Sequence, residues 1–229
     1  MREFGSHGIN RVTEQPTAGH MLLRAPTLPI SPRAEQTMAM PAMRRRWTPE
    51  HVRRLIDESR AWPRYELIDG ELLVTPAPGH PHQLAVGELH LLLAPYVERE
   101  GLGLTLLSPS DVELRPDTIT QPDLYVLSAG PDEKLLLTIE VISPSSIRTD
   151  RVTKRDFYME SGVAEYWVVD LDARMVERWT PHQETPLVER STLTWQPHGS
   201  ASPLEIELSL LFDRVSLKSE IARKALDRR

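Results

Sequence analysis

Residues 134–162 read KLLLTIEVISPSSIRTDRVTKRDFYMESG, and this stretch decides the fold class. Residues 135–142 are almost continuously apolar, with Glu140 as the one charged interruption. Continuous apolarity over this length predicts a central strand that is covered on both faces. A helix is expected from about residue 150 to residue 161, because Gly162 is a suitable C-terminal cap. A covered strand followed by a helix predicts an α/β protein.

Further strands and a helix surround this stretch. Residues 166–169 form a second apolar run, and residues 175–179 are expected to pair with it. Upstream, apolar residues at mixed three- and four-residue spacing predict a helix over residues 82–99. Between this helix and residue 134, the predicted strands are residues 102–106, 111–114 and 123–127. Strands that lie between two helices and are followed by a further strand predict a core in which helices flank a central sheet.

Two local motifs precede this core. The sequence TPE at residues 48–50 places a capping hydroxyl, a first-turn proline and a first-turn acid in the order of a helix start. The helical pattern then continues to about residue 60. Residues 65–74 read as two short strands around an Asp-Gly turn, which is typical of a β-hairpin. The folded part is therefore expected to begin with a helix and a hairpin.

The two ends of the chain differ from the core. Residues 1–46 hold five of the 20 prolines, seven arginines against three glutamates and no periodic apolar pattern, so a disordered tail is expected. The folded domain is expected to span residues 47–229, with its core at about 82–180. Beyond residue 180 the pattern is less regular. Trp195 and residues 204–212 are expected to pack there, with a homodimer contact as an alternative role.

Composition excludes several classes of protein. The 229 residues include no cysteine, which excludes disulfides, thiolate zinc sites and cysteine nucleophiles. No apolar run approaches the ~18 residues that a membrane helix needs, and the N-terminus lacks a signal-peptide pattern. A soluble, cytoplasmic protein without membrane contact is therefore expected. Gly-rich phosphate loops and the G-x-S-x-G and H-E-x-x-H motifs are also absent.

Acidic residues inside strands are the most informative feature for function. Asp and Glu are rare in strands and seldom fully buried unless they are paired. Asp123 opens the strand predicted over 123–127, and Glu140 interrupts the strand predicted over 135–142. If these strands are neighbours, both carboxylates converge in an oxygen-rich site that suits Mg²⁺ or Mn²⁺. The backbone carbonyl of Val141 is a candidate third ligand.

Lys154 is the candidate cation of this site. Asp150, Lys154 and Tyr158 share one face of the predicted helix by their i,i+4 spacing. A lysine beside metal-bound carboxylates can orient or activate the attacking water and stabilise charge in a phosphoryl transition state. Three structural alternatives stand beside this interpretation: Asp123 as a turn residue, Glu140 paired with an arginine, and Lys154 exposed to solvent.

A set of motifs in a fixed order carries a resemblance to a known family. The motifs are YELIDGEL at 65–72, His82, QPD at 121–123, IEVISPSS at 139–146, Asp150, Lys154, Tyr158 and GVAEYWVVD at 162–170. This order resembles the Uma-two endonuclease-like family of the PD-(D/E)xK restriction-endonuclease-like superfamily, over roughly residues 48–180. The resemblance implies a restriction-endonuclease-like core with the order helix, three strands, helix, strand, in which helices flank a mixed central sheet. It also implies a divalent-metal nuclease site with Asp123 and Glu140 as ligands.

One position departs from the superfamily pattern. The superfamily lysine stands two residues after the glutamate, where this chain has Ile142. The resemblance implies that Lys154 takes over from the neighbouring helix. Glu71, just past the hairpin turn, is a candidate further carboxylate. His82, near a helix N-terminus, is a candidate phosphate contact or auxiliary base.

The first functional hypothesis is a Mg²⁺-dependent endonuclease that hydrolyses DNA, with Lys154 assisting the attacking water and Tyr158 orienting Lys154. The alternatives are a non-catalytic interaction module on a nuclease fold and a phosphohydrolase for a small nucleotide. A net charge of -6 without a basic stripe disfavours strong binding of duplex DNA. Arg148, Arg151 and Arg155 are expected to provide a local positive rim.

Overall fold

The computed structural model describes residues 46–59, 62–131 and 133–227. The described residues belong to one compact unit. The tail predicted over residues 1–46 lies outside the described residues, apart from Arg46. Within the described ranges, no helix is both long enough and apolar enough to cross a membrane.

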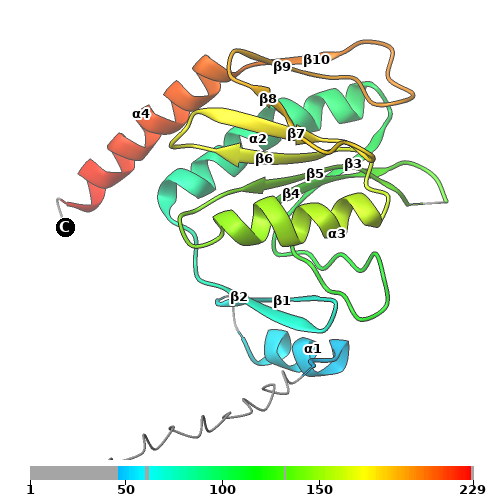
Figure 1. Ribbon diagram of the computed structural model, residues 1–229. Helices are drawn as coiled ribbons and strands as arrows, with labels where there is room; N and C mark the ends of the chain where they lie inside the picture. Colours follow the sequence, from blue (N-terminus) through cyan, green and yellow to red (C-terminus); the bar gives the residue numbers. More distant parts are fainter. Residues whose placement is uncertain (1–45, 60–61, 132, 228–229) are drawn as a thin grey trace, which may run out of the picture. The chain divides into compact units, whose positions relative to one another are not determined.

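A six-stranded mixed sheet forms the centre of this unit (Figure 1). Its strands in spatial order are β3 (Gly103–Leu107), β4 (Leu124–Ser128), β5 (Leu135–Val141), β6 (Tyr166–Asp170), β7 (Met175–Trp179) and β8 (Leu187–Glu189). Strands β5 and β6 are parallel, and the other neighbours are antiparallel. A parallel pair needs a crossover, which η1 (Thr149–Lys154) and α3 (Arg155–Glu160) provide. The predicted mixed sheet is confirmed.

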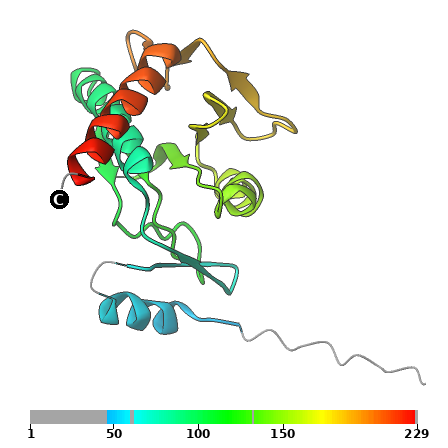
Figure 2. The ribbon, with the colours of Figure 1, turned by 90° about the vertical axis from the view of Figure 1, so that its left-hand side faces the viewer.

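Alternating strand residues divide the core between the two faces of the sheet. Leu124 and Val126 of β4 belong to the apolar cluster that includes buried residues of α2 (His80–Arg99) and α4 (Leu208–Leu226). Tyr125 lies between them in sequence and belongs instead to the cluster of Phe157 in α3. Figures 1 and 2 show α2 and α4 together on one side of the sheet and α3 on the other. The fold is therefore a mixed α/β fold with helices on both faces.

The N-terminal helix and hairpin form as their local sequence predicts. Helix α1 (Pro49–Glu58) is capped by Thr48, whose side chain accepts a hydrogen bond from the His51 N–H. Strands β1 (Arg64–Ile68) and β2 (Glu71–Thr75) pair around Asp69 and Gly70, which both have positive φ angles, of 50° and 81°. These angles are those of the hairpin turn that favours Asp-Gly.

The hairpin is joined to the segment that precedes β4. Leu67 and Ile119 exchange two backbone hydrogen bonds, of 2.7 and 2.8 Å. This bridge holds β1 beside the chain that leads into Asp123. It places the hairpin within reach of the central sheet, although no sequence pattern links the two segments.

Three segments differ from their predicted form. Residues 111–114 form a single bridge, between Val112 and Thr120, and not a strand. The helix after β5 begins with the wider turn of the π-helix η1. Beyond β8, where the sequence pattern was less regular, β9 (Thr192–Trp195) and β10 (Leu204–Glu207) form a hairpin, and the helix α4 follows it. Trp195 is buried against Trp167, as the packing prediction required.

Candidate active site

Asp123 lies immediately before β4, where three groups contact its carboxylate. Arg64 Nη2 lies 3.0 Å from Oδ1, and His82 Nε2 lies 2.9 Å from Oδ2. The backbone N–H of Val141 donates to Oδ2 at 2.9 Å. Burial alone would raise the pKa of Asp123, but His82, Arg64 and the Val141 N–H lower this pKa to about 2. Asp123 is therefore a buried, ionised carboxylate and not a solvated turn residue.

The backbone of Val141 faces the same edge of β5 as Asp123. Ile142 donates its N–H to the carbonyl of Val169 in β6, and Thr138 donates its N–H to the carbonyl of Glu165, just before β6. Because strand residues alternate in direction, Val141 directs its N–H and C=O toward β4. Continuing the β4–β5 register places Pro122 opposite Val141, and proline has no N–H to donate. The Val141 carbonyl therefore points toward Asp123 without a sheet donor from that position.

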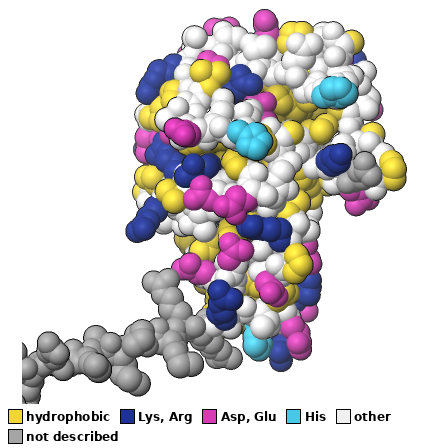
Figure 3. All heavy atoms as spheres, turned by 45° about the vertical axis from the view of Figure 1, so that its right-hand side comes forward, with side chains coloured by type: hydrophobic (Ala, Val, Ile, Leu, Met, Phe, Trp, Pro, Cys, Tyr) yellow, Lys and Arg dark blue, Asp and Glu magenta, His cyan; other side chains and the backbone are white. Residues whose placement is uncertain are grey.

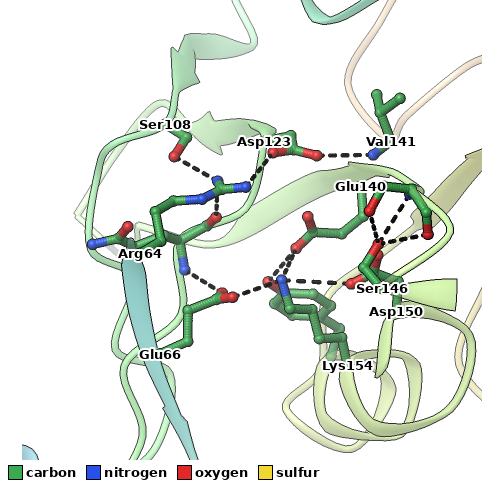
Figure 4. A network of polar contacts seen from close by, with 12 residues as sticks. Arg64, Glu66, Ser108, Asp123, Glu140, Val141, Ser146, Asp150 and Lys154 are labelled. Atoms are coloured by element: carbon green, nitrogen blue, oxygen red, sulfur yellow. Dashed lines mark hydrogen bonds and ion pairs between the residues drawn. The ribbon is translucent and has the colours of Figure 1, made fainter. Parts of the chain in front are cut away.

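Glu140 and Lys154 form the second half of the site (Figure 4). Oε1 of Glu140 accepts hydrogen bonds from Lys154 Nζ at 2.9 Å and from the Tyr158 hydroxyl at 3.3 Å. Lys154 Nζ also lies 3.0 Å from Glu66 Oε2 and 3.6 Å from Asp150 Oδ1. Glu140 is thus paired with a lysine and not with an arginine. Lys154 is buried and not exposed to solvent.

Two residues of this network were missed in the sequence: Arg64 and Glu66 of β1. Glu66 is fully buried, and its Oε1 accepts a hydrogen bond from the Gln121 N–H at 2.8 Å. In sequence, these two charges alternate with Tyr65 and Leu67, which is the pattern of a strand with one solvent-facing side. The structure instead covers both sides of this strand. Two charged residues two apart beside an Asp-Gly turn were the only available signal.

The cluster contains more negative than positive charge. Its four buried carboxylates belong to Glu66, Asp123, Glu140 and Asp150, and its two permanent cations are Arg64 and Lys154. Burial raises the pKa of Glu140 well above its usual value, and the neighbouring carboxylates raise this pKa further. Burial also raises the pKa of Asp150. For Lys154, burial lowers the pKa but the surrounding carboxylates outweigh it, so the ammonium pKa is raised. Bound protons or a bound cation must balance the surplus of negative charge.

These shifts predict how the stability of the metal-free protein depends on pH. The raised pKa of Glu140 means that the folded state holds a proton that the unfolded chain releases. This stability is complete below the unfolded pKa and is lost as pH rises through the folded pKa, at ~1.4 kcal/mol per pH unit. The contribution of Asp123 to stability depends on pH in the opposite direction. Because its pKa is lowered, this contribution is present at neutral pH and is lost only as pH falls from about 4 toward 2.

Urea denaturation in EDTA is therefore expected to give a lower free energy of unfolding at about pH 8 than at about pH 5. In the matched variant Glu140→Gln this decrease should be smaller, because glutamine does not titrate. Equal slopes in the two proteins would contradict the raised pKa of Glu140.

The side chains of the network open onto a cleft of about 240 Å³. Arg64, His82, Asp123, Glu140 and Lys154 all line this cleft. The loop from Thr75 to Gly79 and the serine-rich turn after β5 supply its other walls. The functional groups are therefore buried from bulk solvent and still reachable by a small charged group.

The structure brings most of the predicted site residues together. The cleft is lined by Asp123, Glu140, Val141, His82 and Lys154. Tyr158 does not line the cleft, but its hydroxyl donates a hydrogen bond to Glu140. Glu71 does not join them. It is exposed at the turn end of the hairpin, two register pairs from Glu66, so the hairpin carboxylate that reaches the site is Glu66.

Two of the three arginines predicted to form a positive rim, Arg151 and Arg155, lie elsewhere. Arg151 lies 2.8 Å from both Asp170 and Glu177, and Arg155 lies over the Trp179 ring at 4.7 Å. Neither arginine lines the cleft. Their contacts are with residues of β6 and β7.

The oxygen donors of the site fit a hard divalent cation. In the part of the chain that the structure describes, no three His, Asp or Glu side chains are grouped to hold a metal by themselves. Two carboxylates, of Asp123 and Glu140, and the Val141 carbonyl are present instead. Mg²⁺ typically uses one or two carboxylates and keeps several waters. The donor chemistry and the surplus negative charge therefore suit such an ion.

The fold and the buried carboxylate–lysine cluster define a mixed α/β protein with a nuclease-like architecture. The family described as "Putative restriction endonuclease" (Uma2) matches residues 49–211, and the chain belongs to this family. A solved structure from Anabaena variabilis ATCC 29413, described as "a putative nuclease belonging to DUF820", has a TM-score of 0.56 to this chain. It is 22% identical, and the match covers 70% of this chain and 96% of that one. This similarity shows the fold. No curated protein matches the chain.

Proposed function

We propose that the chain is a divalent-metal-dependent endonuclease that hydrolyses phosphodiester bonds in DNA. The observation that carries the proposal is the surplus of buried carboxylates beside the Lys154 ammonium, at the base of an open cleft. One divalent cation would neutralise this surplus. Membership of a family described as restriction endonucleases supports the choice of a phosphodiester substrate.

Asp123, Glu140 and the Val141 carbonyl would hold Mg²⁺ or Mn²⁺. When bound, the ion supplies Lewis-acid polarisation of a phosphoryl oxygen and lowers the pKa of a bound water. The protein's own contribution is to orient the ligands. Arg64 and the Val141 N–H fix both oxygens of Asp123, and Tyr158 donates to Glu140 at the oxygen that Lys154 also contacts.

Lys154 would act as a fixed positive charge. Its Nζ is held among Glu140, Glu66 and Asp150, so little side-chain freedom remains to be lost when substrate binds. Because its pKa is raised, Lys154 keeps its proton at neutral pH. It therefore stabilises charge that develops on the phosphoryl oxygens and does not accept the proton of the attacking water. Glu66 and Asp150 are positioning residues for this ammonium.

His82 and the start of α2 would contact the substrate phosphate. His82 lies in the first turn of α2, lines the cleft and contacts Asp123. The N-terminus of a helix favours anions, because its first N–H groups have no partner within the helix. This local positive end matters because basic and acidic side chains are interspersed on the face shown in Figure 3, without a continuous basic stripe.

The test is calorimetric titration of Mg²⁺ and Mn²⁺ into the wild type and into Asp123→Asn, followed by a nuclease assay. Asp123→Asn is expected to weaken metal binding more than ~100-fold, since even outer-shell partners of a metal contribute ~10- to 100-fold. Cleavage of DNA should be lost in parallel. Asp156→Asn, an exposed aspartate on α3, is the matched control and should retain both properties.

Two outcomes would contradict the proposal. Absence of metal binding by the folded wild type at millimolar concentrations would leave a non-catalytic interaction module on a nuclease fold. Metal-dependent hydrolysis of small nucleotides without cleavage of DNA would point to a phosphohydrolase. The assay therefore includes single-stranded DNA, duplex DNA and a small phosphodiester.

A further inference from the structure

A second cavity of about 180 Å³ adjoins the cleft and shares part of its lining. Arg64, His82 and Asp123 line both this cavity and the cleft. Its remaining walls are mostly apolar, with two polar groups, and consist of Trp62, Pro78, Gln83, Val86, Ser108 and Pro109. The cavity therefore combines apolar walls with a few polar groups and adjoins His82, the residue expected to contact the substrate phosphate.

Trp62 is the most distinctive wall of this cavity. It is 39% exposed, although tryptophan is buried to a high degree on average. The Arg64 guanidinium lies over its ring, with Cζ 5.2 Å from the ring centroid. Arg64 is itself fixed by Ser108 at 2.8 Å, by the Gln121 carbonyl at 3.1 Å and by Asp123. A rigid, buried cation therefore supports one side of an exposed aromatic ring.

We propose that this cavity, which we name the Trp62 pocket, binds one unpaired nucleobase of the DNA strand next to the phosphate in the cleft. The inference rests on the proposed function, because it assigns the neighbouring nucleotide of the same substrate. Aromatic side chains bind bases by stacking, whatever the sequence. A cavity of ~150 Å³ is enough to hold one benzene ring, so the Trp62 pocket has room for a single planar ring system and not for a base pair.

The polar groups of the pocket fit this ligand. Gln83 offers an amide and Ser108 a hydroxyl, both of which can hydrogen bond to the edge of a base. Arg64 and His82 line both the pocket and the cleft, so the phosphate that joins two nucleotides would lie close to them. Since a base in a duplex is paired and stacked, entry requires an unpaired strand or a base flipped out of the helix. The site should therefore favour single-stranded DNA, in which no base pair has to be broken before the base enters.

The first experiment measures binding of oligothymidylate in Ca²⁺, in place of Mg²⁺, to suppress cleavage. Trp62→Ala is expected to weaken binding ~5- to 150-fold, the range that one stacked base contributes. Trp62→Phe keeps an aromatic ring and should bind within ~3-fold of the wild type. Quenching of tryptophan fluorescence by the oligonucleotide should be smaller in Trp62→Phe, although its affinity is retained.

A series of oligonucleotides, each with one abasic site at a different position, tests whether a base occupies the pocket. At one position the missing base should weaken binding to the wild type and leave binding to Trp62→Ala unchanged. If Trp62→Ala binds like the wild type, or if duplex and single strand bind equally, the base pocket is wrong. Retained metal binding and cleavage in that case would leave the nuclease proposal intact. A wild type that binds no oligonucleotide would overturn both proposals.

Discussion

Glu140→Gln is expected to abolish metal binding and DNA cleavage while leaving the metal-free protein as stable as the wild type or more so. The amide oxygen of glutamine can still accept the hydrogen bonds of Lys154 and Tyr158. The variant loses a carboxylate whose charged form is disfavoured by burial, so the free energy of unfolding in EDTA should not fall at about pH 8. Metal affinity and cleavage should fall more than ~100-fold.

A second buried glutamate provides the control for this result. Glu177 on β7 is also buried, but its partner is Arg151 and it does not line the cleft. Glu177→Gln is expected to show the opposite pattern, with reduced stability and unchanged metal binding. Calorimetry and urea denaturation on both variants separate the two roles. If Glu140→Gln unfolds the protein or retains metal binding, Glu140 is a structural residue and not a ligand.

Lys154→Met should produce the largest loss of stability of any single change in the site. Methionine has a similar shape but no charge, so Glu66, Glu140 and Asp150 would lose the ammonium that contacts all three. Removing one partner of a buried ion pair costs ~3–5 kcal/mol, because the remaining charge is buried without compensation. Cleavage should be lost even at temperatures where the variant remains folded.

The pH dependence of this loss identifies its cause. Burial raises the pKa of Glu140 and of Asp150, so these carboxyl groups take up protons more readily as pH falls, and the difference in unfolding free energy between the wild type and Lys154→Met should be smaller at about pH 5. At about pH 8 the difference should be largest. Lys224→Met is the control, because Lys224 is exposed and its ion pair is with Glu220, one helical turn away on α4; its effect should stay within ~0.5 kcal/mol. A deficit that does not change with pH would indicate lost packing instead of uncompensated charge.

Local sequence was sufficient to predict the elements of the core. The continuous apolar run of β5 could be recognised because a strand covered on both faces has no polar side to alternate with. The helix cap at Thr48 and the turn at Asp69 and Gly70 depend on hydrogen bonds and φ angles within four residues. Asp123 and Glu140 were found because ionisable residues next to apolar strand residues need a partner.

The predictions failed where a contact between distant segments decides the outcome. Glu66 and Lys154 are far apart in sequence, and their pairing depends on the bridge between Leu67 and Ile119 that places β1 beside the site. Glu71 satisfied the same local criteria as Glu66 and yet remains exposed at the turn. Arg151 was expected at the cleft but is paired with Asp170 and Glu177.

Most strands and helices between residues 49 and 179, the hairpin of β1 and β2 and the family could therefore be predicted from the sequence, because these depend on periodicity, capping and motifs along the chain. Only the tertiary structure decided which charges meet. Burial sets the strength of an interaction between charges and the pKa of each group, and burial is a property of the packed molecule. Asp123 and Glu140 illustrate the difference. Both carboxylates lie at one end of the sheet, but His82 and Arg64 lower the pKa of Asp123, whereas burial and the neighbouring carboxylates raise the pKa of Glu140.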